Sequence, residues 1–432
     1  MVVLKNRPCI IEGIRTPFVK AGRELSNIFA HDLGRLAVTE LLYKADCDAA
    51  IIDKIIFGVV AQPAEVSNIA RVIGLFSGLS PEIPAYTVQL NCASGLRAIA
   101  SAADQIILKN STAVICGGVE SISNIPLKTN PLMSEFYAQV SSKLSLIEKA
   151  KVMQQFRPDF FRPVVALAEY LKDGYSGMAM GQTAELIAKK WGISREAQDL
   201  WALRSHERAR EAHNNLLHRD EIFPIFIRPD YEKVIERDLS VRYQQSRQAL
   251  TKLRPFFDRV AGTVTRGNMA PLVDGSAALL VMNSERAVEI GFKPEVRILA
   301  YADSAVTPED MGLAPLVAIA KVLQKAKLKL DQIQLIEVND TFAAHILALF
   351  KACKTSHSNL ASTYNCIPSA EINPDIVNVN GGTLAIGHSL AASSARIVIH
   401  LMKELQRRDF SLGLAVSAAN GGQALAMILE RT

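Results

Sequence analysis

One order of elements occurs twice in the chain, and this repetition limits the fold more than any other feature. Helically spaced apolar residues over 32–45 precede the buried-strand pattern DKIIFGVV at 53–60. The segment 313–340 has the same order of helix, linker and apolar strand. Continuous apolar strands separated by helices predict a parallel or mixed sheet that is covered on both faces.

A second pair of strands supports two similar α/β halves. TAVICGG at 112–118 and GLAVSAANGG at 413–422 are both apolar and both end in a glycine pair. Between the halves, residues 128–254 are richer in Lys, Arg, Gln and Met and contain a highly charged amphipathic helix. We expect this region to be an insertion over the first half, since long insertions in compact folds often form lids or binding loops.

The bulk composition excludes several classes of protein. The 432 residues carry a formal charge of only +5, and no dense Lys/Arg block with interleaved aromatics points to nucleic acid. No apolar run has membrane-spanning length, and Lys5 and Arg7 interrupt the place of a signal peptide. The cysteines (9, 47, 92, 116, 353 and 366) have neither zinc-site nor disulfide-framework spacing. A reducing, cytoplasmic location is expected.

Polar or reactive residues follow four of the apolar segments. They lie in NCASG around Cys92, EVNDTFAAH at 337–345, NGGTLAIGHS at 380–389 and SAANGG at 417–422. The carboxyl ends of buried strands are the usual place for an α/β active site. Cys92 precedes a helix, where unpaired N–H groups lower the pKa of a thiol. Taken singly, each residue also fits a structural role: Cys92 as core packing, His388 in a turn, Asn339 as a helix cap.

The order of these motifs resembles that of the thiolase family, in particular the long-chain 3-ketoacyl-CoA thiolases of the trifunctional-enzyme β-subunit type. The resemblance implies an α/β thiolase-like fold with two similar α-β-α-β-α halves, five-layered, with an inserted loop domain. It places the N-terminal half at 1–127 plus 255–283, a lid for CoA and acyl chain at 128–254, and the C-terminal half at 284–432. The matching motifs are EGIRTPF (12–18), AHDLGRLA (30–37), SNIAR (67–71), GGVESIS (117–123), MGQTAELIAKKWGISREAQD (180–199), LRSH (203–206), GTVTRGN (262–268), DGSAALL (274–280), NVNGGTLAIGH (378–388) and GGQALAMILE (421–430).

The resemblance also implies roles for single residues. Cys92 matches the nucleophile that takes the acyl group from CoA as a thioester, and His388 matches the histidine that deprotonates it. Asn339 matches the asparagine that holds a water beside that histidine, and the backbone N–H groups of Cys92 and Asn420 would form the oxyanion hole. These roles meet the needs of acyl transfer: an activated thiol, a base and donors aimed at developing charge. The substrate-binding positions implied are Met180, Arg266, Ala270, Phe342 and Gly421.

The chain departs from the family at the second catalytic cysteine. Counting back from the closing glycine pair, that position is Ala418, which has no proton to exchange. Losing a positioned acid or base typically costs ~10²–10⁴-fold in rate. A substitute relay is hypothesised through Thr341, a water and His345, which share a face if the helix has already begun. Ser417 is expected to face away, since neighbouring side chains in a strand alternate.

Three functions follow from this departure. The first is acyl-CoA C-acyltransfer, the reaction of 3-ketoacyl-CoA thiolase or acetyl-CoA acetyltransferase in fatty-acid β-oxidation. The second is an acyltransferase or thioesterase that acylates Cys92 without carbon–carbon chemistry. The third is a catalytically poor subunit within an oligomer, which the presence of both Cys92 and His388 disfavours.

Cofactors and partners are inferred mainly from the resemblance. No metal or redox cofactor is expected, and CoA and acyl-CoA are substrates. A homodimer or tetramer is implied, formed by sheet edges of the first half, and a partner α-subunit of a β-oxidation complex is suggested. The segment 141–165 mixes cations with apolar residues. It fits a peripheral membrane contact, a partner surface or a buried lid over the acyl pocket.

Overall fold

The computed structural model describes residues 7–294, 296–354 and 371–432, so Cys366 and the charged N-terminal Lys5 lie outside the described residues. A mixed ten-stranded sheet runs through the protein in the order β12-β13-β14-β11-β1-β10-β5-β3-β4, with β2 paired to β10. Its strands are β1 (Pro8–Arg15), β2 (Val19–Lys20), β3 (Lys54–Gly58), β4 (Ala85–Val88), β5 (Ala113–Glu120), β10 (Val273–Asn283), β11 (Val296–Ala305), β12 (Leu335–Val338), β13 (Leu412–Ala419) and β14 (Gln423–Arg431).

The two halves of this sheet meet at one short contact between β1 and β11, where Cys9 pairs with Arg297 and Ile10 with Val296. Parallel pairs (β3 with β4 and β5, β12 with β13) lie toward the two ends, and antiparallel pairs lie between them. The expected mixed sheet is therefore confirmed.

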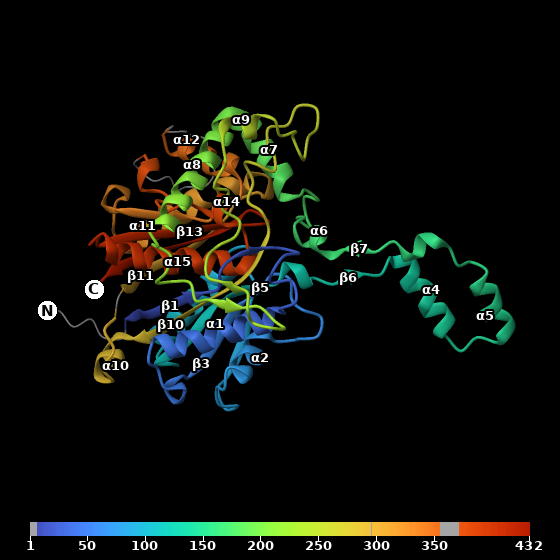
Figure 1. The fold of residues 1–432 in the computed structure, drawn as a ribbon, viewed down its shortest axis with the longest axis horizontal. Coiled ribbons are helices and arrows are strands. Elements are labelled where there is room, and N and C mark those ends of the chain that lie inside the picture. The colour runs from blue at the N-terminus through green and yellow to red at the C-terminus, as the bar shows by residue number, and fades with distance from the viewer. Residues whose placement is uncertain (1–6, 295, 355–370) are drawn as a thin grey trace.

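Helices cover both faces and give five layers (Figure 1). The middle layer is α3 (Ser94–Ile107) and α15 (Leu390–Arg407), which share one apolar core with strands of both halves. The outer layers are α1 (Ala30–Lys44) and α2 (Ile69–Phe76) on the first half, and α11 (Ala314–Ala326) and α12 (Ala343–Lys354) on the second. The two α/β halves predicted from the repeat, and the five-layered arrangement that the resemblance implies, are observed.

Small residues allow the middle layer to pack closely. A Cβ built on Gly95 of α3 would lie 2.4 Å from the carbonyl oxygen of Ala391, and one built on Gly118 of β5 would lie 2.5 Å from the same oxygen. Real Cβ atoms do not approach backbone oxygens so closely, so both positions require glycine. The start of α15, in the second half, therefore packs closely against α3 and β5, which belong to the first half.

The inserted region contacts both halves, which differs from the expectation that it covers the first. Its helices α7 (Met180–Trp191) and α8 (Arg195–Asn214) pack against α12 and α14 (Thr383–Ile386) of the second half. Buried Ile187, Trp191 and Trp201 belong to the core of that half. The ribbon β8 (Ile225–Phe226) and β9 (Val234–Ile235) packs on the core of the first half. Apolar side chains on the two parts of the insertion thus fix it to different surfaces.

One part of the insertion projects away from the body of the protein (Figure 1). The projecting hairpin, residues 127–165, consists of the ribbon β6 (Leu127–Lys128) and β7 (Val164–Val165) with α4 (Pro131–Ser141) and α5 (Leu146–Met153) at its end. Leu146 is 88% exposed and Ile147 is 72% exposed. The expectation of a buried lid over 141–165 is therefore wrong, because Leu146, Ile147 and Phe161 are exposed; the buried apolar side chains of the hairpin, Met133 and Phe136, lie in α4.

The remaining helices are short, and none of those described could cross a bilayer. They are α6 (Ala166–Tyr170), α9 (Arg247–Thr251) and α10 (Ser284–Glu289). Among residues 7–294, 296–354 and 371–432, no helix combines the length and apolar character of a membrane span. The five described cysteines are free thiols.

Candidate active site

Cys92 and His388, 296 positions apart, meet between the two halves. His388 Nε2 lies 3.2 Å from Cys92 Sγ, and both residues are almost fully buried. Cys92 comes from the turn before α3 and His388 from the turn before α15. This is within proton-transfer distance, so the pair has the geometry of a nucleophile and its base.

The turn that carries Cys92 is held by local hydrogen bonds. Asn91 adopts a positive φ of 44°, which asparagine tolerates better than most residues. Ser94 Oγ accepts from the Leu90 amide at 2.8 Å and donates to the Asn91 carbonyl at 2.6 Å. A Cβ on Gly58 would lie 2.5 Å from the backbone of Ser94, so glycine is needed beneath the turn. These contacts fix the thiol at the start of the helix.

His388 is held by backbone pairing and by one serine. Its amide donates to the Pro271 carbonyl at 2.7 Å, and its carbonyl accepts from the Val273 amide at 3.1 Å. Gly387 before it has φ of 104°, which permits the sharp turn. Ser393 Oγ lies 3.1 Å from His388 Nδ1 and orients the ring. The base role requires that Nδ1–H donate to Ser393, which leaves Nε2 free to accept the thiol proton.

The electrostatics of the resting site differ from the prediction for Cys92. Burial, followed by the nearby Glu120 carboxyl, raises the pKa of the Cys92 thiol to about 12, although the backbone N–H groups of Asn420 and Cys92 lower it. Burial, followed by Arg396, lowers the pKa of His388 to about 3. The expected low pKa is therefore wrong for the free site, because desolvation outweighs the helix N-terminus. Both groups are neutral at rest.

Hydrogen bonds link Asn339 and Asn420 to the segment that carries Cys92. Asn339 Nδ2 donates to Ser417 Oγ at 3.0 Å, and Asn339 Oδ1 accepts from Thr383 Oγ1 at 2.8 Å. Ser417 Oγ in turn donates to the Cys92 carbonyl at 3.3 Å. The carbonyl of Asn420 accepts from Asn91 Nδ2 at 2.9 Å. The side chain of Asn339 therefore acts within the protein as a bridge, with one N–H remaining for a further acceptor.

The position of the missing cysteine lies on the open side of its strand. Ala418 in β13 pairs with Ala424 and is partly exposed, whereas Ser417 beside it is fully buried. The Ser417 hydroxyl contacts Asn339 and the Cys92 carbonyl, so it belongs to the hydrogen-bond network of the site. Helix α12 begins at Ala343, two residues after Thr341, so the condition for a shared helical face with His345 is not met. His345 is buried, and burial lowers its pKa to about 4.

The five positions that the resemblance assigns to substrate binding lie in different surroundings. Met180 and Phe342 are buried in the same apolar cluster as Cys92, together with Leu390. The Ala270 amide donates to the Thr341 carbonyl at 2.9 Å. Arg266 is exposed, and its guanidinium lies 4.9 Å from the ring centre of Phe256. Gly421 has a φ of 82° beside the turn that contains Asn420.

Two polar residues of the site, Glu120 and Ser393, were not found from the sequence, and Ser417 was named there only as a residue expected to face away. Glu120 is fully buried and accepts from the amides of Val60 and Ala61, at 3.1 and 2.8 Å, and burial raises its pKa to about 7. Ser393 and Ser417 orient the residues of the site through the bonds above. Their signal was weak, since GGVES and the serine pair SS at 393–394 also fit plain packing of small residues.

Sequence comparison identifies the class of protein. The thiolase N-terminal domain matches residues 9–285 and the thiolase C-terminal domain matches residues 292–431. The chain therefore belongs to the thiolase family, as its motifs had indicated, and it is an acyltransferase enzyme.

Individual relatives agree with this assignment over nearly the whole chain. The 3-ketoacyl-CoA thiolase of Erwinia tasmaniensis is 38% identical over 98% of this chain and 97% of its own. That of Pectobacterium carotovorum is 36% identical over 99% and 97%. Among solved structures, human mitochondrial 3-ketoacyl-CoA thiolase is 30% identical with a TM-score of 0.85, covering 99% of this chain and 100% of its own. The Bacillus anthracis acetyl-CoA acetyltransferase has a TM-score of 0.85 at 31% identity, covering 99% of both chains.

Proposed function

We propose that the protein catalyses the reaction of 3-ketoacyl-CoA thiolases in fatty-acid β-oxidation, by a ping-pong mechanism through acyl-Cys92. The observation that carries this proposal is the 3.2 Å contact between Cys92 Sγ and His388 Nε2. The names of the relatives supply the substrate class, a 3-ketoacyl-CoA. CoA is proposed as the second substrate, in keeping with the structure of the human mitochondrial 3-ketoacyl-CoA thiolase in complex with CoA.

The first step transfers a proton from the Cys92 thiol to His388 as sulfur attacks the 3-keto carbon. The bond between the keto carbon and the α-carbon then breaks, which leaves an acyl group on Cys92 and a carbanion on the departing acetyl-CoA. We assign the backbone N–H groups of Cys92 and Asn420 to the acyl oxygen, and a water to the remaining N–H of Asn339. Transfer of the acyl group to the thiol of CoA completes the cycle.

The departing carbanion must receive a proton, and Ala418 cannot supply it. We retain the hypothesis of a relay in which a water beside Thr341 passes the proton of His345. The lack of a hydrogen-bond partner for His345 Nε2 within the described part of the chain supports it. Because burial lowers the pKa of His345 to about 4, the relay requires the ring to take up a proton from water before it passes one on. Replacing His345 with Gln keeps a polar group but removes the titratable ring. If the relay operates, His345→Gln should slow thiolysis and leave acylation of Cys92 unchanged. Thiolysis as fast as that of the unaltered protein would rule out the relay.

The decisive assay for the proposed function combines two readings. Loss of ketoacyl absorbance is followed with a 3-ketoacyl-CoA and CoA, and the acyl-enzyme is measured by mass, with Cys92→Ser as the control. The proposal predicts CoA-dependent loss of absorbance and an acyl group on Cys92. Acylation without thiolysis would favour an acyltransferase or thioesterase that lacks carbon–carbon chemistry.

A homodimer or tetramer is proposed through the edge of the first half. Strand β4 is the last strand of the sheet at that end, and its four residues are only partly buried. An unpaired edge invites pairing with a second copy. Light scattering after size-exclusion chromatography tests this, and a monomer at micromolar concentration would contradict it.

The projecting hairpin is proposed as a docking element for an α-subunit or a membrane surface. It exposes Leu132, Leu146, Ile147 and Phe161 next to lysines such as Lys149. Apolar residues among cations suit both surfaces. Sedimentation with anionic vesicles distinguishes them, because a membrane contact binds vesicles without any partner and a subunit contact does not.

Further assignments follow from the family. We propose the domain division 1–127 plus 255–283, 128–254 and 284–432, and a cytoplasmic location, in keeping with the free thiols of the described residues. The reaction proposed for Cys92 and His388 requires no metal or redox cofactor.

A further inference from the structure

Three potential metal ligands converge at the border between the inserted region and the first half. They are His213 near the end of α8, His218 in the following turn and Asp238 after β9. One ligand atom from each lies within 4.8 Å of the other two, and all three residues are buried. His213 Nε2 lies 3.9 Å from Asp238 Oδ2, which is too long for a hydrogen bond.

Three of the four imidazole nitrogens of His213 and His218 have no hydrogen-bond partner among the residues that the structure describes. Within the described residues, neither Nδ1 nor Nε2 of His218 has a hydrogen-bond partner, nor does Nε2 of His213. A buried polar atom without a partner is costly, so three such nitrogens in one place require an explanation. An imidazole nitrogen without a hydrogen-bond partner is able to coordinate a metal ion when the ring is neutral.

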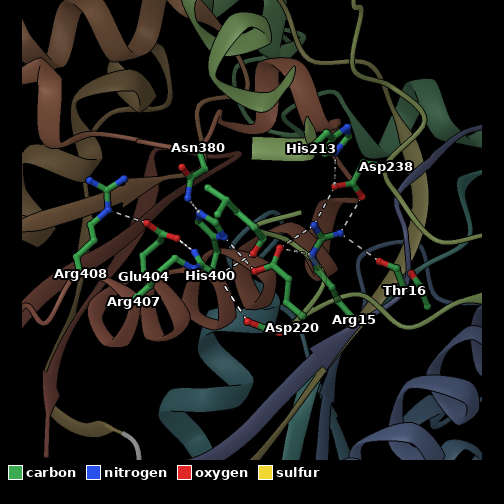
Figure 2. A network of polar contacts seen from close by, with 12 residues as sticks. Arg15, Thr16, His213, Asp220, Asp238, Asn380, His400, Glu404, Arg407 and Arg408 are labelled. Carbon is green, nitrogen blue, oxygen red and sulfur yellow. Dashed lines mark hydrogen bonds and ion pairs between the residues drawn. The ribbon is translucent and has the colours of Figure 1, made fainter. Parts of the chain in front are cut away.

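The far sides of two ligands are already fixed. Tyr243 Oη lies 3.1 Å from His213 Nδ1, which directs His213 Nε2 toward Asp238. Arg15 donates to Asp238 Oδ1 and Oδ2, both at 2.8 Å, and Asp238 Oδ1 also accepts from the Phe18 amide. Figure 2 shows Asp238 between Arg15 and His213. Such outer partners orient ligands in known metal sites.

A cavity gives an ion a route to these ligands. It has a volume of about 570 Å³ and is lined by both histidines, with Glu236, Arg219 and Arg237 at its wall. Asp238 brings one carboxylate to this place, and it lies between Arg15 and His213. The two imidazoles and this carboxylate therefore face one another beside the cavity.

A neighbouring set, His218, Glu221 and His400, is less suitable. His400 Nδ1 is bonded to Glu221 Oε2 at 3.0 Å, and this bond would have to break. Arg15 donates to Glu221 Oε1 and to both oxygens of Asp238, so this contact does not separate the two sets. In the set of His213, His218 and Asp238, the imidazole nitrogens that would hold an ion have no hydrogen bond to break among the described residues.

We propose that His213, His218 and Asp238 bind one divalent transition-metal ion of the zinc class, with a further ligand position facing the cavity. Two imidazoles and a carboxylate are ligands that Zn²⁺ accepts. The ion joins α8, the turn after it and the segment after β9 to Arg15 of β1. It is a structural ion, and the steps assigned to Cys92 and His388 do not use it. The ligands are 5 and 20 residues apart in sequence, a spacing that matches no short metal motif.

The test uses the full chain with Cys92→Ser, because a thiol next to the imidazole of His388 is able to take up added Zn²⁺ and would confuse the titration. The protein is stripped with a chelator and titrated with Zn²⁺ against a chromophoric competitor. One ion per chain at micromolar affinity or tighter is expected. His213→Ala and His218→Ala, each added to Cys92→Ser, should weaken binding at least 100-fold. Tyr243→Phe should weaken it about tenfold, since it removes only an outer partner.

A matched control is available at His31. Its Nε2 also lies 3.9 Å from a carboxylate, that of Asp32, but within 7–294, 296–354 and 371–432 no second imidazole completes a cluster there. His31→Gln should leave Zn²⁺ affinity unchanged. Unchanged affinity in folded His213 and His218 variants, or no stoichiometric binding by Cys92→Ser, would overturn the proposal.

A second measurement serves if the histidine variants do not fold. Co²⁺ replaces Zn²⁺ in the folded Cys92→Ser protein, and its visible absorption reports nitrogen and oxygen ligation. A saturable spectrum at one equivalent, together with a rise in Tm when Zn²⁺ is added, is expected. The absence of both signals would also overturn the proposal.

Discussion

Restoring the second cysteine should accelerate thiolysis. Ala418→Cys places a thiol at the position where thiolases carry their acid and base, on a strand whose alternation is already correct. Ser417 points into the interior toward the Cys92 carbonyl, and Ala418 faces the open side. A new sulfur at 418 therefore enters space that is only partly occupied.

The expected gain is set by proton transfer. A positioned acid or base contributes ~10²–10⁴-fold, which corresponds to about 2.7–5.5 kcal/mol in the activation barrier. The structural cost is small, because a substitution at a partly exposed position usually changes stability by about 0.5 kcal/mol or less. The gain in rate should therefore exceed any loss of folded protein by a wide margin.

The assay separates two half-reactions. Thiolysis of a 3-ketoacyl-CoA is followed by absorbance, and acylation of Cys92 by an acyl-CoA is followed by mass. Ala418→Ser is the matched control, because its hydroxyl has nearly the size of the thiol but titrates far outside the useful range. Ala418→Cys should raise thiolysis alone. If it is no faster than Ala418→Ser, proton supply does not limit this enzyme and the reasoning fails.

Four further outcomes follow from the structure. Ser393→Ala should slow acylation of Cys92 about tenfold or more by freeing the ring of His388, whereas Ser393→Thr should retain most activity in stopped-flow assays. Because the pKa of His388 is lowered to about 3, that base is neutral from pH 5 to 8, and acylation rates should show no acid limb near pH 6.5. Gly95→Ala should destabilise the fold by about 1–3 kcal/mol and lower Tm, since its Cβ meets the Ala391 carbonyl at 2.4 Å. Arg15 holds the pKa of Asp238 well below its usual range, so the stability that this carboxylate contributes is present above about pH 4 and lost as pH falls further. Asp238→Asn should thus give a flatter acid limb in chemical unfolding, and an unchanged limb would contradict it.

The sequence predicted the fold because its strands are apolar throughout and its helices have regular spacing. The doubled order of elements led to two halves, and the glycines beside Cys92 and His388 indicated where chain segments approach. The contact between Cys92 and His388 depends on α3 and α15 sharing one layer. Motif order predicted that contact, whereas composition alone did not.

Other features depend on contacts that no local pattern encodes. Helices α7 and α8 pack on the second half because Ile187, Trp191 and Trp201 are buried in its core, and their partners there are distant in sequence. The raised pKa of Cys92 results from complete burial beside Glu120, and neither is visible in the motif NCASG. The cluster of His213, His218 and Asp238 arises only when a turn and a ribbon fold back together.

Formation of the acyl-enzyme tests the central claim most directly. The intact protein is mixed with an acyl-CoA, quenched within milliseconds to seconds, and mapped by peptide mass spectrometry. One acyl group per chain on Cys92, with formation slowed at least 100-fold in His388→Ala, is the predicted result. Acylation at another residue, or acylation of Cys92 at an undiminished rate without the imidazole, would contradict the account.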